Sequence, residues 1–221
     1  MSELQLILRR PAEAARRATE GESLRTLVAT SLAAIVCGAA AFGGVVGSFR
    51  GGLQIAYAAV KLPLALCATL AIAVPAFHAI GVALGQRWTF RGVVALSLAS
   101  AARGALVLFA LAPALWLAID RGLAYHATAL AATLAFALSG VAALAVLLRG
   151  LGGHGLAQLA SAVAIASVFL LVSGQTSWIL RPWLVRPRTE DVPFVRAREG
   201  SFADALARSS LSATGRYEGE R

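Results

Sequence analysis

Long apolar stretches separated by short polar breaks dominate the chain. An α-helix needs about 20 apolar residues to cross about 30 Å of hydrocarbon, and five stretches reach that length, near 26–47, 64–84, 93–118, 124–148 and 156–180. The stretches are continuously apolar and lack the alternation of a membrane β-barrel wall. The pattern therefore predicts an all-α fold, a polytopic membrane helix bundle with about five transmembrane helices in a domain covering 26–180.

The segments outside these spans have patterns of their own. Residues 1–25 combine an apolar patch with arginines and predict a basic interfacial tail, an amphipathic helix on an anionic leaflet. Residues 181–221 form a polar C-terminal tail in which a helix-capping pattern predicts a short helix near 202–211. Between the first two spans, we expect residues 53–60 to lie in the interface before Pro63 turns the chain inward.

Composition supports a membrane protein and changes how the charge is interpreted. With 58% hydrophobic and 14% charged residues, the chain cannot cover itself with polar groups as a water-soluble domain does. The net charge of +9 lies mainly beside apolar runs, which indicates anionic phospholipid headgroups rather than nucleic acid. We expect a multi-pass protein of a cell membrane, typical of the bacterial cytoplasmic membrane. The cations that flank the spans number eight on each side, so the positive-inside rule leaves the orientation open.

The sequence lacks the residue patterns of catalysis. It has no Ser/His/Asp arrangement, paired carboxylates or nucleotide-binding loop, and its histidines and cysteines lie far from metal-ligand spacing. We therefore expect no enzyme, no metal and no cofactor.

Arg103 is the strongest individual anomaly, because it lies about 15 Å into the third span by helical rise. One interpretation is structural: the guanidinium joins helices by bonding to Ser139, Ser167 and the carbonyl of Ala71, which Pro75 leaves without its helical donor. The other is functional, with Arg103 binding an anion, a lipid phosphate or an acidic residue of a partner subunit. Both interpretations stay open at this point.

Two further patterns concern helix shape and packing. Pro75 and Pro113 lie inside predicted spans and are expected to kink them. Two sets of glycines spaced by four are expected to let helices pack closely: Gly43, Gly47 and Gly51 in one, and Gly81 and Gly85 in the other.

The exit from the fifth span is the most distinctive segment. Its candidate binding residues are Gln175, Trp178, Arg181 and Trp183, followed by Pro193-Phe194, and Lys61 near the second span is a further candidate. This segment resembles the C-terminal signature of a bacterial family of multi-pass membrane proteins, and Lys61-Leu62-Pro63 is also similar to that family. The resemblance implies a membrane-embedded fold and no particular activity. Physically, the segment is either a membrane-exit anchor or a docking surface for a partner.

Two functions are compatible with these features. The sequence favours an assembly, scaffold or accessory subunit of a membrane complex, with a membrane-protein partner or a second copy of the chain. The alternative is a small anion or lipid-headgroup transporter that uses Arg103.

Overall fold

The computed structural model describes residues 2–83, 85, 89–150, 156–180, 183–185 and 194–195. Every regular element within these ranges is an α-helix, which confirms the predicted all-α fold. The helices are α1 (Glu3–Arg9), α2 (Pro11–Glu20), α3 (Leu24–Ser48), α4 (Leu53–Ala83), α5 (Phe90–Asp120), α6 (Tyr125–Gly150) and α7 (Leu156–Ile179).

Helices α3 to α7 are each long and apolar enough to cross a membrane. They correspond one to one with the five predicted spans, and the largest difference is that α4 begins at Leu53 rather than at 64. By length and composition, the fold is that of a multi-pass integral membrane protein.

The early start of α4 corrects the prediction that the chain turns inward at Pro63 after a separate segment at residues 53–60. The helix continues through Pro63, although proline removes one backbone hydrogen bond. Close packing against α3 supports this stretch, because Gly43 and Gly47 lie directly against the backbone of Ala58 and Gln54.

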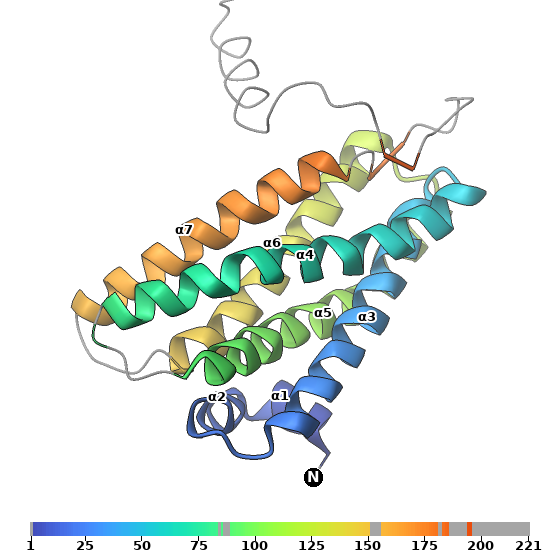
Figure 1. Cartoon of the computed structure of the whole chain (residues 1–221). Helices are drawn as coiled ribbons and strands as arrows, with labels where there is room; N and C mark the ends of the chain where they lie inside the picture. Colours follow the sequence, from blue (N-terminus) through green and yellow to red (C-terminus); the bar gives the residue numbers. More distant parts are fainter. Residues whose placement is uncertain are drawn as a thin grey trace, which may run out of the picture.

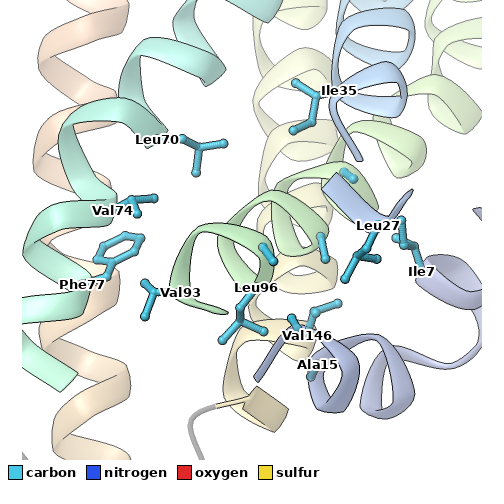
Figure 2. Packing of buried hydrophobic residues seen from close by; sticks show 14 of the residues in the cluster. Ile7, Ala15, Leu27, Ile35, Leu70, Val74, Phe77, Val93, Leu96 and Val146 are labelled. Carbon is cyan, nitrogen blue, oxygen red and sulfur yellow. The ribbon is translucent and has the colours of Figure 1, made fainter. Parts of the chain in front are cut away.

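Helix α5 forms the centre of the bundle, and α6 and α7 lie at its edge (Figure 1). Helix α5 packs against α3, α4 and α6, whereas α7 packs mainly on α4. Figure 2 shows Val74 and Phe77 of α4 facing Val93 of α5 in the largest apolar cluster. In the most apolar window of each helix, 56% of α5 is buried but only 17% of α6. The centre of the bundle is thus well covered, and α6 presents most of its surface outward.

The N-terminal tail folds back as two short helices. Ser2 caps α1 through its side chain, and Pro11 occupies the first turn of α2, as the backbone requirements of helix starts favour. Helix α2 packs on α5 and α6. Leu6 and Ile7 are buried in the protein, while Leu4 and Leu8 are 41% exposed. The predicted apolar patch is therefore divided between the protein core and the outer surface, because α1 packs against α2, α3 and α5.

An ion-pair network holds the polar side of this hairpin together. Arg16 pairs with Glu13, Glu20 and Glu22, and Arg17 pairs with Glu13 and Glu3. Hydrogen bonds from Arg16, and then from Arg17, lower the pKa of the Glu13 carboxyl to about 2. All four described carboxylates of the hairpin are thus engaged by its own arginines.

Candidate functional site

The described part of the exit segment folds back onto the first half of α4. Lys61 of α4 is fully buried, and its Nζ lies 5.0 Å from the centroid of the Phe194 ring. Phe194 also meets Tyr57 edge to face, with 5.2 Å between ring centroids. A cation over an aromatic face is attracted by the ring quadrupole. Phe194 therefore forms part of the cover over the Lys61 ammonium.

Trp183 contacts the same part of α4 through its backbone. The side-chain amide of Gln54 donates a hydrogen bond to the Trp183 carbonyl oxygen at 3.2 Å. The Trp183 indole N–H donates to the carbonyl oxygen of Ser177 at 2.9 Å. We call Gln54, Tyr57, Lys61, Trp183 and Phe194 the exit cluster.

Sequence reasoning found Lys61 and Trp183 but missed Gln54 and Tyr57. Gln54 and Lys61 are seven residues apart and share one face of a continuous helix, which was the available signal. The predicted break before Pro63 hid it, because residues 53–60 were placed outside the span.

The other candidate residues of the exit segment are placed only in part. Gln175 and Trp178 lie half-buried in the last turns of α7, and both make further interactions. Arg181 and the predicted helix near 202–211 lie outside the described residues. The contacts of Trp183 and Phe194 join the described exit residues to α4.

Arg103 lies elsewhere, at the packing contact between α5 and α6. The next residue, Gly104, faces the side chain of Ser139, and a Cβ at Gly104 would lie 2.9 Å from the Ser139 Oγ. Arg103 is half-buried, but its Nη1 atom is buried and has no hydrogen-bond partner among the described residues.

The acceptors proposed for Arg103 from helix depth were wrong. No hydrogen bond joins Arg103 to Ser139, Ser167 or Ala71 in the described ranges, and both Ser167 and Ala71 are exposed. The physical reason is that equal depth does not put two side chains on facing sides of their helices. Ser167 and Ala71 point away from the centre of the bundle, where α5 lies.

The structure separates the predicted packing glycines into two kinds. Gly43 and Gly47 lie against the α4 backbone, and Gly81 is buried within α4. Gly51 and Gly85 are turn residues with φ of +83° and +78°, and a Cβ at either position would have no described atom within 4 Å, so their assignment to helix packing is a correction. Their left-handed backbone conformation is the physical reason for glycine there.

The predicted kink prolines and possible metal ligands add no second site. Pro75 and Pro113 lie inside continuous helices and are exposed on the outer surface. Among the described residues, no three His, Cys, Asp or Glu side chains gather as a metal site would require.

Comparison of the chain with protein-family models, curated proteins and solved structures finds no match.

Proposed function

We propose that this integral membrane protein acts by binding, and that Arg103 receives an anionic group inside the bundle. The observation that carries the proposal is the buried Nη1 atom of Arg103, which has no partner in the described ranges. A buried donor without an acceptor costs about 1–3 kcal/mol, and more when it is charged. A structural arginine would have its acceptors within the bundle, so the geometry favours the functional interpretation.

The charge inventory of the spanning helices supports the same proposal. Within the described residues of α3 to α7, the single carboxylate belongs to Asp120. It is exposed in the last turn of α5, more than four helical turns from Arg103 along the chain. A negative charge for Arg103 would therefore come from outside these helices, as a small anion, a lipid headgroup or an acidic residue of a partner.

Thermal unfolding of the full chain in mild detergent tests this function. Ligand that binds only the folded state raises the unfolding temperature, so inorganic phosphate or phosphatidylglycerol should stabilise the parent protein. Arg103→Gln should lose most of that shift, whereas Arg91→Gln, an exposed arginine of the same helix, should keep it. Equal shifts in the parent and Arg103→Gln proteins would contradict the proposal.

We propose an assembly or accessory subunit as the second candidate function. The outer face of α6 favours it, because Leu130, Leu134, Leu138 and Val141 are all strongly exposed. Helix α6 packs on α5 and α2, and in the described ranges it has at most marginal contact with α7, its neighbour in sequence. In a membrane, lipid acyl chains cover such a face by default, and a transmembrane partner or a second copy would replace them.

Native mass spectrometry in mild detergent tests the second candidate. Leu134→Trp should release a subunit that packs on α6, while Leu170→Trp, on the exposed face of α7, should leave the complex intact. A chain that is monomeric in all three forms, with no co-purifying partner, would contradict an assembly role.

A further inference from the structure

The contacts between α5 and α6 fix where a second arginine lies relative to Arg103. The hydroxyl of Ser100 donates to the Ala143 carbonyl oxygen at 2.7 Å, and Gly150 lies against the side chain of Leu96. The two helices are therefore antiparallel, with the end of α6 beside the start of α5. Arg149, in the last turn of α6, lies on the N-terminal side of Arg103 along α5.

The directions of the two side chains bring their charges together. Helical side chains lean toward the N-terminus of their own helix, so Arg103 leans toward the end where Arg149 lies. Arg149 leans the opposite way in space, because its Nη1 donates to the Ala145 carbonyl oxygen at 2.7 Å, one turn deeper in the bundle. The two guanidiniums thus approach each other near the level of Ala145. Consistent with this, Arg149 repels the positive charge of Arg103.

Among the described residues, the nearest acidic segment does not neutralise this pair. The N-terminal hairpin covers the same end of the bundle, where Ala15 packs with Leu96 and Val146 (Figure 2). Its described carboxylates, however, are engaged by Arg16 and Arg17. Arg103 is half-buried and Arg149 is exposed at the end of α6. Two neighbouring like charges disfavour each other, and an anion between them offsets that repulsion.

We propose that Arg103 and Arg149 form a two-armed site for a phosphate-type oxyanion, either a phospholipid headgroup or free phosphate. The proposal rests on the anion-binding function of Arg103. It adds Arg149 as the second binding residue and a phosphate-type oxyanion as the class of ligand. Guanidinium presents planar pairs of N–H donors that match phosphate oxygens. Free phosphate and the non-bridging oxygens of a phosphodiester headgroup both carry enough lone pairs to accept from the two arginines at once.

Lipid retention by the full chain, measured by native mass spectrometry, tests the site. The protein in mild detergent is incubated with phosphatidylglycerol, with a phosphate-free galactolipid or with inorganic phosphate. The parent protein should retain phosphatidylglycerol and not the galactolipid. Arg103→Gln and Arg149→Gln should each weaken retention about tenfold, the size of one lost charge-assisted bond, and Arg91→Gln should leave it unchanged. Arg103→Lys keeps the charge without the planar donors and should show an intermediate loss.

The outcomes separate this site from the function on which it rests. Loss of binding in Arg103→Gln but not in Arg149→Gln would overturn the two-armed site and leave the function of Arg103 standing. Unchanged retention in both variants, with all proteins monodisperse, would overturn both. If phosphate binds and phosphatidylglycerol does not compete, the site takes a free oxyanion; if only the lipid binds, it takes a headgroup. Equal retention of the galactolipid would show that phosphate is not recognised, and would overturn the proposal.

Discussion

Lys61 and Arg103 are both cations within membrane-spanning helices, but the surroundings of their side chains differ. Lys61 is fully buried on α4 and covered by Phe194 from the exit segment. Arg103 is half-buried on α5 and holds a donor without a partner in the described ranges. The same chain covers one cation with its own residues and leaves a buried donor of the other without a described acceptor. A charge in a membrane helix is therefore a functional candidate only after its local contacts are known.

Charge reversal should separate the two positions most strongly. Lys61→Glu would place a fully buried carboxylate against the negative face of the Phe194 ring, and an uncompensated buried charge costs about 3–5 kcal/mol. Arg103→Glu would place the carboxylate near Arg149, an attractive neighbour. We expect Lys61→Glu to aggregate or unfold and Arg103→Glu to stay monodisperse, as judged by size-exclusion chromatography and thermal unfolding in detergent. Similar losses in both would remove the distinction.

A matched pair of glycine substitutions tests the close packing of α3 against the half of α4 that carries Lys61. A Cβ at Gly47 would collide with the Gln54 carbonyl oxygen, whereas one at Gly44 would meet only side-chain carbons at 3.8 Å. Both changes to alanine alter helix propensity equally, so their difference isolates the collision. Gly47→Ala should lower the free energy of unfolding by about 1–3 kcal/mol relative to Gly44→Ala, measured in the same detergent. Equal free energies of unfolding for the two variants would mean that α3 and α4 accommodate the added methyl group without loss of stability.

A substitution at Phe194 tests the aromatic part of the cover over Lys61. Phe194→Ala removes a cation–π contact of about 0.5–2 kcal/mol and leaves the helices unchanged. Because Lys61 is the only lysine in the chain, its acylation by an amine-reactive reagent can be followed by mass spectrometry of the peptide that contains it. We expect faster acylation in Phe194→Ala than in the parent, and no change in Val195→Ala, a neighbour that is exposed. An unchanged rate would show that Phe194 does not cover the amine.

Acid should affect the N-terminal hairpin, which packs on α5 and α6, and leave the exit cluster unaffected. The pKa of Glu13 is about 2 in the folded chain against an ordinary value of 4.5, because Arg16 and Arg17 bond to its ionised form. Its stabilising contribution is complete above pH 4.5 and is lost as the pH falls through about 2. Amide protection factors in α2, corrected for intrinsic exchange, should begin to fall below pH 4.5 and reach their low-pH level near pH 2. Protection factors that stay constant from pH 4.5 down to pH 2 would contradict the paired state of Glu13.

The sequence predicts where the helices lie along the chain but not which of their faces pack against one another. Continuous apolar runs fix where helices form in a membrane, so α3 to α7 could be placed from hydropathy alone. The burial of Leu6 and Ile7 could not be predicted, because these side chains would suit a lipid surface as well as the protein core in which they lie.

For the candidate site, sequence supplied the residues and not their neighbours. Depth along a span identified Arg103, but its contacts depend on helix rotation, which a run of alanine and leucine does not specify. Phe194 reaches Lys61 only through tertiary folding of a segment more than a hundred residues later. Arg149 appeared in the sequence as one of many flanking cations, and only the antiparallel register of α5 and α6 places it beside Arg103.

The glycine contact between α3 and α4 bears on how the chain enters a membrane. The two helices are joined by a tight turn at Gly51 and Gly52, and they mesh without intervening side chains at Gly43 and Gly47. Such a pair needs no residue from later in the chain to form its interface. It can therefore enter the bilayer as a preassembled hairpin during synthesis, and provide the surface on which α5 and then α7 are added.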